Sequence, residues 1–404
     1  MDVSEVWETL AQPEGGKIIY LILDGLGGLP DLERGGTELQ VAHTPHLDNL
    51  AKRSSCGLLE MVGPGITPGS GPGHLALFGY DPLKYPIGRG VLSALGIDFA
   101  LQEGDVAARV NFATIDAQGI ITDRRAGRID TATNQRLCRK LNDNLSLSFD
   151  GEYHFEPVSE HRAVLILRGT DLSGEVQDTD PQTTGVAPLD PEPRTEQAQH
   201  TANIVDSFVR QARDILADDK PANMLLLRGF EQYEPIPSLH DRFRLTGVCI
   251  ADYPMYRGVS RLLGLDVMPP SGGLKARFQA LQSCYGEAYN FYFLHVKNTD
   301  SKGEDGDFEA KVASIEAVDR LLPQVTSLHP DVLVVTADHS TPSVLGSHSW
   351  HPVPVLLQAA TAHRDAVATF DEYACSQGIL GLRPGMYIIG LALAHARRLK
   401  KYGA

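Results

Sequence analysis

Residues 17–25 read KIIYLILDG, an apolar run that ends abruptly at Asp24 and Gly25. A strand with one face in water alternates apolar and polar residues, whereas a strand that is buried on both faces loses this alternation. The run therefore predicts a buried strand of a parallel sheet, with Asp24 at its carboxyl end.

The same pattern recurs in the second half of the chain. Residues 290–296 (NFYFLHV), 331–336 (DVLVVT) and 352–357 (PVPVLL) are further strand-like runs. Between the first two, residues 308–322 carry apolar side chains at helical spacing. Strands that alternate with helices predict an α/β fold with a mainly parallel sheet that is covered by helices.

Acidic and imidazole side chains accompany these strands. Asp24, Asp300 and Asp338 each follow a strand, His339 comes directly after Asp338, and His348 precedes the last run. Ligands of such sheets bind beyond the carboxyl ends of the strands, so we expect these side chains at one rim. A single Asp there is more often a turn or cap residue, but three favour a metal site. Mixed carboxylate and imidazole ligands suit Mn²⁺ or Zn²⁺, and pairs of such ions serve phosphoryl transfer.

Ser70 lies in a segment that is rich in glycine and proline. Residues 63–73 (GPGITPGSGPG) predict irregular backbone, and we expect a helix to begin at His74. A serine hydroxyl becomes a nucleophile when a base or a metal ion activates it, and a helix N-terminus beside it can bind phosphate. The alternative is that Ser70 only caps this helix. The segment lacks the Lys-Ser/Thr ending of a nucleotide P-loop. The glycines that follow Asp24 do not form a dinucleotide-binding loop either, because Pro30 occupies the position of the third glycine of G-x-G-x-x-G.

Composition limits the classes of partner. The 404 residues carry a formal net charge of −15, which argues against nucleic acid and anionic membranes because both are polyanions. The five cysteines form no C-x-x-C pair, so we expect free, buried thiols. The N-terminus has no signal-peptide pattern, and no apolar run approaches the ~18 residues of a membrane span. These features predict a cytoplasmic protein with a small-molecule substrate.

The middle of the chain differs in composition from the two ends. It has clustered arginines and a long polar stretch over residues 169–200 that predicts a surface loop. We therefore expect an α/β core formed by residues 1–105 and 263–404. A smaller α+β domain, residues 106–262, would be inserted into it.

Several motifs carry a family resemblance, and the most specific are TPGSGPGHLALFGYDP at residues 67–82 and DRRAGRI at residues 123–129. With segments spread over essentially the whole chain, they resemble the alkaline phosphatase superfamily. Within it, they are similar to the cofactor-independent phosphoglycerate mutases of the archaeal type, which also occur in bacteria. The resemblance implies an alkaline phosphatase-like core that interconverts 3-phosphoglycerate and 2-phosphoglycerate through a phosphoserine, in glycolysis and gluconeogenesis.

The resemblance also implies site residues and cofactors. Ser70 would be the nucleophile, beside two divalent ions that are usually Mn²⁺, with Mg²⁺, Zn²⁺ or Co²⁺ as alternatives. One ion would be bound by Asp24, Ser70, Asp338 and His339. The other would be bound by Asp300, His348 and the residue four positions after Asp300, which is commonly His in the family and is Glu304 here. Glutamate can ligate these metals, but Glu304 can equally be a solvated loop acid.

Substrate binding is implied for arginines, which suit bidentate capture of carboxylate and phosphate. The candidates are Arg89, Arg124, Arg125, Arg128 and Arg257. Each of them could instead pair with a surface acid. The general acid stays open among Asp98, Asp116 and Asp123.

Two alternative functions remain at the level of sequence. The same scaffold serves metal-dependent phosphatases, phosphopentomutases and phosphotransferases to other alcohols such as homoserine, because a fold does not determine a function. The second alternative is a protein that binds metal and phosphate without catalysis, for which the substitution at Glu304 is the single supporting feature.

Overall fold

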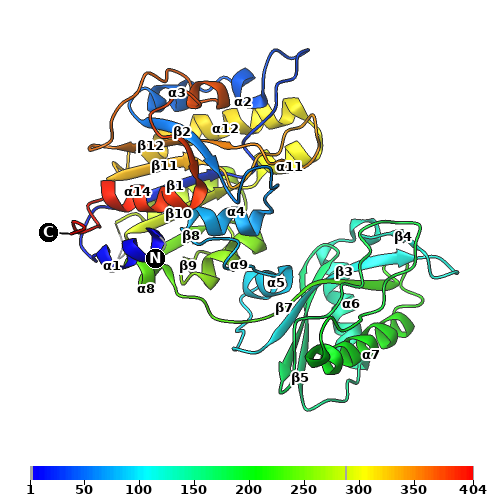
Figure 1. Ribbon diagram of the computed structural model, residues 1–404. Coiled ribbons are helices and arrows are strands. Elements are labelled where there is room, and N and C mark those ends of the chain that lie inside the picture. The colour runs from blue at the N-terminus through cyan, green and yellow to red at the C-terminus, as the bar shows by residue number, and fades with distance from the viewer. Residues whose placement is uncertain (1–2, 287–288, 404) are drawn as a thin grey trace. The chain divides into compact units, whose positions relative to one another are not determined.

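The computed structural model describes residues 3–286 and 289–403 and divides into two compact units (Figure 1). Unit 1 comprises Met1–Pro86 and Pro237–Ala404, and unit 2 comprises Ile87–Ile236. The chain thus leaves unit 1 once and returns to it once.

The limits of unit 2 differ from the expected residues 106–262 at both ends. Helix α5 (Arg89–Gly96) packs on strands β3 (Val106–Ile115) and β7 (Met224–Gln232), and it approaches β3 closely because a Cβ on Gly90 would lie 2.2 Å from the Ala107 carbonyl oxygen. At the other end, α9 (Pro254–Leu262) packs on α4 (Ser70–Leu77) and so belongs to unit 1.

Unit 1 contains an eight-stranded sheet whose central strands are fully buried. Strand β1 (Ile18–Leu23) lies between β10 (Phe291–Val296) and β11 (Val332–Thr336) and is parallel to both, which confirms the interpretation of the apolar runs. Strand β12 (Val353–Ala359) is antiparallel to β11 and to β2, so the sheet is mostly parallel rather than wholly so. The order across the sheet is β13 (Gly381–Pro384), β2 (Ser55–Glu60), β12, β11, β1, β10, β8 (Gly247–Ile250) and β9 (Asp266–Val267).

Helices cover both faces of this sheet (Figure 1). On one face α12 (Phe308–Thr326) packs with α2, α3 and α10, and on the other α4 packs with α9 and, through η3, lies near α14. Helix α12 matches the expected helix over residues 308–322 and continues for one further turn. The remaining helices of unit 1 are α1 (Val3–Leu10), α2 (Glu38–Val41), α3 (Pro45–Ala51), α8 (Leu239–Phe243), α10 (Leu274–Cys284), α11 (Asn298–Glu304), α13 (Glu372–Cys375), η3 (Gly385–Tyr387) and α14 (Ile388–His395).

Helix α4 begins four residues earlier than expected, at Ser70 instead of His74. The expectation was wrong because Pro72 falls in the first helical turn, where N–H groups have no intrahelical partner and proline costs little. Gly73 has a packing role, since an added Cβ would lie 2.2 Å from the backbone oxygen of Asp338. Gly73, one of the glycines that suggested irregular backbone, therefore allows α4 to approach the segment after β11.

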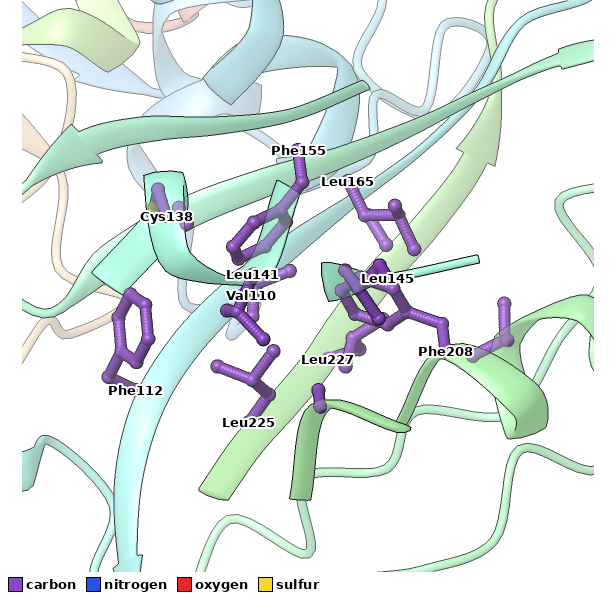
Figure 2. Close-up of a cluster of buried hydrophobic side chains, with 14 of the residues drawn as sticks. Val110, Phe112, Cys138, Leu141, Leu145, Phe155, Leu165, Phe208, Leu225 and Leu227 are labelled. Atoms are coloured by element: carbon purple, nitrogen blue, oxygen red, sulfur yellow. The ribbon is translucent and has the colours of Figure 1, made fainter. Parts of the chain in front are cut away.

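Unit 2 is built around an antiparallel sheet of five strands. Strand β3 pairs with β6 (Arg162–Gly169), β7 and β4 (Ile121–Asp123), and β6 pairs with β5 (Gly151–Ser159). Figure 2 shows part of its core, in which Phe155, Leu165 and Leu227 of the sheet point toward Leu141 and Phe208 of two helices. The helices of this unit are α5, η1 (Ala126–Arg128), α6 (Thr131–Asn144), η2 (Glu196–Ala198) and α7 (Gln199–Ile215).

Other expectations concern loops and thiols. The polar stretch forms a loop between β6 and η2, and an isolated antiparallel β-bridge between Val176 and Pro193 pairs two parts of this loop. All five cysteines are free and buried, as expected. None of the helices in the described residues combines the length and the apolarity that crossing a membrane requires.

Candidate functional site

The carboxyl ends of β1, β10 and β11 bring four polar side chains to one rim of unit 1. Asp24 follows β1, Asp300 lies in α11 just after β10, and Asp338 and His339 follow β11. All four side chains are fully buried. The tight turn after Asp24 needs Gly25, whose φ is +62° and whose added Cβ would lie 2.5 Å from an oxygen of Thr341.

Asp24, Asp338 and His339 form the first compact group of candidate ligands. The Nε2 atom of His339 lies 3.3 Å from Asp24 Oδ1 and 3.2 Å from Asp338 Oδ2. Both of these oxygens are buried and have no hydrogen-bond partner among the described residues. Buried carboxylate oxygens are costly unless a positive charge lies beside them, so this group is a candidate site for a metal ion.

Asp300, His339 and His348 form the second group. His348 Nε2 lies 3.4 Å from Asp300 Oδ1, and its ring stacks on that of His339 with 3.6 Å between centroids. The Thr341 hydroxyl donates to Asp300 Oδ1 at 2.6 Å and orients that carboxylate. In each group, one ligand atom per residue lies within 4.8 Å of the others.

The donor chemistry of both groups fits divalent ions. Carboxylate oxygen with imidazole nitrogen suits Mn²⁺ or Zn²⁺, and His339 belongs to both groups, so two ions would be neighbours. Burial opposes the charged ring of His339, but the carboxylates of Asp338 and Asp24 outweigh it and raise its pKa to about 9. Protons and a divalent ion therefore compete for the same imidazole.

Ser70 is the first residue of α4 and lies beside the first group. Its Oγ atom is 3.3 Å from His339 Nε2. His74, one turn further along α4, lies with its Nδ1 atom 2.7 Å from the Ser70 carbonyl oxygen and 3.2 Å from Asp338 Oδ2. His74 thus links the first turn of α4, which bears the Ser70 hydroxyl, to Asp338 at the rim. Ser70 does not cap α4 with its side chain, because the N-cap residue is Gly69.

Glu304 lies near the second group but is more open than the other candidates. Its Oε1 atom is 3.8 Å from His348 Nε2, and 55% of its side chain is exposed. Among the described residues it is not part of either compact group. The structure therefore places Glu304 within reach of His348 without bringing it to Asp300 and His339.

Sequence reasoning missed several residues that surround Asp24. Lys297 Nζ lies 3.2 Å from Asp24 Oδ2, the Tyr256 hydroxyl donates to the same oxygen, and His295 Nε2 is 3.4 Å from it. Burial raises the pKa of Asp24, but the charge of Lys297 leads the effects that hold it well below its usual value. The sequence offered one signal for Lys297, which is its position three residues before Asp300.

The candidate arginines separate into two sets. Arg257 is buried in α9 of unit 1 and donates to the Met268 carbonyl oxygen. The others belong to unit 2, where Arg124 binds Asp180 through two hydrogen bonds of 2.8 and 2.7 Å. Arg89, Arg125 and Arg128 are exposed to solvent.

The three candidates for the general acid also lie in unit 2. Asp116 and Asp123 accept hydrogen bonds from nearby backbone N–H groups, Asp116 from residues 118 and 120 and Asp123 from residues 125 and 127. Both carboxylates therefore stabilise turns. Asp98 follows α5 with a left-handed φ of +67°.

Comparison with known proteins identifies the family of the chain. The family model of 2,3-bisphosphoglycerate-independent phosphoglycerate mutase matches residues 51–223. A relative from Thermus thermophilus, named "Probable 2,3-bisphosphoglycerate-independent phosphoglycerate mutase", is 48% identical, and the match covers 100% of both chains. A relative of the same name from Deinococcus radiodurans is 46% identical, again over 100% of both chains.

The chain belongs to the 2,3-bisphosphoglycerate-independent phosphoglycerate mutase family. It is an enzyme, a phosphoglycerate mutase of the isomerase class. Solved structures agree: the cofactor-independent phosphoglycerate mutase from Thermoplasma acidophilum is 29% identical with a TM-score of 0.68, covering 94% of this chain and 100% of that one. The PH0037 protein from Pyrococcus horikoshii is 28% identical with a TM-score of 0.82, covering 96% and 100%. Both likenesses extend over both units.

Proposed function

We propose that this mutase interconverts 3-phosphoglycerate and 2-phosphoglycerate through a phosphoserine at Ser70, without 2,3-bisphosphoglycerate. The observation that carries the proposal is the position of the Ser70 hydroxyl, 3.3 Å from the imidazole that belongs to both groups of candidate metal ligands. A nucleophile beside two metal sites at the start of a helix is an arrangement that suits phosphoryl transfer.

The protein groups would act by position and charge. The first turn of α4 directs backbone N–H groups without intrahelical partners toward a bound phosphoryl group. Asp24, Asp338 and His339 would hold one ion, and Asp300 and His348, with Glu304 as a further ligand, would hold the other. Bound divalent ions would lower the pKa of the serine hydroxyl and offset charge on the phosphoryl oxygens. The carboxylate and imidazole donors favour two Mn²⁺ ions.

Finer points of the proposal concern the type of enzyme and its location. Similarity to the structures from Pyrococcus horikoshii and Thermoplasma acidophilum, whose sources are archaea, supports the archaeal type within the alkaline phosphatase superfamily. A cytoplasmic enzyme of glycolysis and gluconeogenesis is consistent with the five free thiols. Unit 2 would clamp the substrate, with Arg89, Arg124, Arg125 and Arg128 as its basic residues and Arg257 added by unit 1.

The test uses 3-phosphoglycerate with Mn²⁺ and an enolase-coupled assay of 2-phosphoglycerate. Ser70→Ala is expected to lower turnover by at least about 10³-fold, because it removes the hydroxyl that accepts the phosphoryl group. The matched control is Ser314→Ala in α12, whose hydroxyl only donates to the Ala310 carbonyl oxygen. Intact mass after rapid quench should show one added phosphoryl group in the unsubstituted protein and none in Ser70→Ala.

Two outcomes would count against this function. Full mutase activity in Ser70→Ala would exclude the phosphoserine. Release of inorganic phosphate without formation of 2-phosphoglycerate would assign the site to a phosphatase instead.

The exposed arginines of unit 2 provide a second test. Arg125→Ala and Arg128→Ala are each expected to raise KM for 3-phosphoglycerate about tenfold, because a guanidinium binds carboxylate or phosphate through paired hydrogen bonds. Arg136→Ala serves as the control, since Arg136 in α6 is exposed and pairs with Asp219. An unchanged KM in both variants would remove these residues from the substrate site.

A further inference from the structure

Lys297 lies between the two groups of candidate metal ligands and contacts both. It follows β10, with its ammonium 3.2 Å from Asp24 Oδ2 and in contact with Asp300 Oδ2. Asp24 belongs to one group and Asp300 to the other. A single side chain of the protein thus joins the two sites where ions would bind.

In both aspartates, one carboxylate oxygen faces an imidazole of the candidate ligand groups and the other faces Lys297. Oδ1 of Asp24 lies 3.3 Å from His339 Nε2, and Oδ1 of Asp300 lies 3.4 Å from His348 Nε2. Both Oδ2 atoms are turned toward Lys297. The ammonium therefore contacts the oxygens that are not directed at His339 and His348, the imidazoles of the candidate ligand groups, although His295 also lies 3.4 Å from Asp24 Oδ2. It does not need to leave when ions bind at the Oδ1 atoms.

The position of the ammonium is built into the fold. Two aromatic rings face it, with Nζ 5.5 Å from the ring centroid of Tyr253 and 5.6 Å from that of Tyr256. Such cation–π contacts favour a charged ammonium at this place. Tyr256 also donates to Asp24 Oδ2, so the same ring orients the carboxylate and faces the lysine.

We propose that Lys297 is a positioning residue that acts as a resident counter-ion for both metal sites. It holds Asp24 and Asp300 in place when ions are absent, and it weakens the binding of each ion when they are present. The inference rests on the metal-binding part of the proposed function and is independent of the phosphoglycerate chemistry.

The direction of the effect follows from Coulomb's law. Three buried carboxylates, Asp24, Asp300 and Asp338, meet at the rim, and like charges taken out of water repel strongly. The ammonium offsets one of the three negative charges, which stabilises the metal-free protein. It also repels a divalent cation that binds within a few ångströms, so that the metal sites bind less tightly than their carboxylates alone would allow.

The experiment measures metal binding by the chelator-stripped full-length protein. Mn²⁺ is titrated by calorimetry into the unsubstituted protein, Lys297→Met and Lys297→Gln, and thermal unfolding is recorded with and without Mn²⁺. Both neutral variants are expected to bind Mn²⁺ roughly tenfold more tightly. Their metal-free forms should unfold at lower temperature, and saturating Mn²⁺ should restore most of that loss.

Two further variants separate charge from shape. Lys297→Arg keeps the charge and should keep the affinity for Mn²⁺ close to that of the unsubstituted protein. Lys302→Met, in the same helix as Asp300, removes a half-buried lysine that pairs with Asp305, and it should change neither measurement. A role that is only structural would weaken metal binding in the neutral variants, which is the opposite direction.

Equal or weaker Mn²⁺ binding in Lys297→Met and Lys297→Gln would overturn the inference. Variants that stay unfolded in saturating Mn²⁺ would overturn it as well. If the unsubstituted protein binds no Mn²⁺, the metal sites of the proposed function fail together with it. Mn²⁺ binding with an unchanged affinity in the variants would refute the role of Lys297 alone.

Discussion

At the scale of single residues, His161 links stability to pH in unit 2. The residue is 1% exposed, and its Nδ1 atom has no hydrogen-bond partner among the described residues. Burial, together with the positive charges of Arg162 and Arg109, lowers its pKa to about 3. The folded protein therefore keeps this imidazole neutral at pH values where an unfolded histidine, with a pKa near ~6.5, takes up a proton.

We expect this difference to reduce stability in acid. Between about pH 6.5 and pH 3 the unfolded chain binds more protons than the folded one, so the free energy of unfolding falls as the pH decreases through this range. From pH 7 to pH 5, the unsubstituted protein should lose roughly 1–2 kcal/mol more than His161→Gln. Urea unfolding at both pH values measures this, with the exposed His200→Gln as the control. Equal losses in His161→Gln and the unsubstituted protein would contradict it.

Residues of the rim could be predicted where the strands themselves position them. Asp24, Asp338 and His339 follow parallel strands directly, so a strand prediction was enough to bring them together. Lys297 and Thr341 could not be found in this way. Their roles depend on which oxygen of a carboxylate they reach, and that depends on the paths of the turns after β10 and β11.

The partners of the candidate arginines could not be predicted from the sequence either. Arginine is suited to bidentate binding, and Arg124 does donate two hydrogen bonds to one carboxylate, but the sequence cannot show that this partner is Asp180, 56 positions away. Glu304 became a candidate ligand through the family resemblance, and its distance of 3.8 Å from His348 depends on how α11 faces the loop that bears the histidine.

At the scale of elements, runs of apolar residues were reliable, and the glycine-rich segment is irregular as expected over residues 63–69 but helical from Ser70. The buried strands β1, β10 and β11 were expected because burial on both faces leaves a continuous apolar run. The start of α4 was misplaced, since glycine and proline disfavour helix by intrinsic propensity. Tertiary packing outweighs that propensity here: the helix must come within contact of the Asp338 backbone, and only a residue without a Cβ fits at Gly73.

The direction of β12 is another property that local pattern does not contain. An apolar run such as that of β12 indicates burial on both faces and is compatible with either direction. The connection between β11 and β12, residues 337–352, carries His348 and holds no helix, and the chain returns antiparallel to β11. A parallel return usually runs through a crossover helix. The same connection brings His348 back to the rim at which β11 ends.

At the scale of the whole molecule, the boundary of unit 2 depends on contacts that are distant in sequence. The expected limit at residue 106 followed a change in composition, but α5 lies before it and packs on β3 and β7. The helix is joined to the sheet by the Gly88 N–H group, which donates to Glu231, a residue of β7. A local composition signal cannot register a contact of this kind.

Unit 2 is therefore expected to fold without the rest of the chain. Three buried apolar clusters lie wholly within it, and the largest joins the sheet to α6 and α7. A polypeptide of residues 87–236 should give dispersed amide resonances and one cooperative urea transition, because its core needs no residue of unit 1. Phe155, fully buried against Phe208 at 5.4 Å between centroids, tests that core: Phe155→Ala should cost about 3–5 kcal/mol. The exposed Val186→Ala is its control. A polypeptide that stays unfolded while the full chain folds would show that unit 2 depends on unit 1 for its stability.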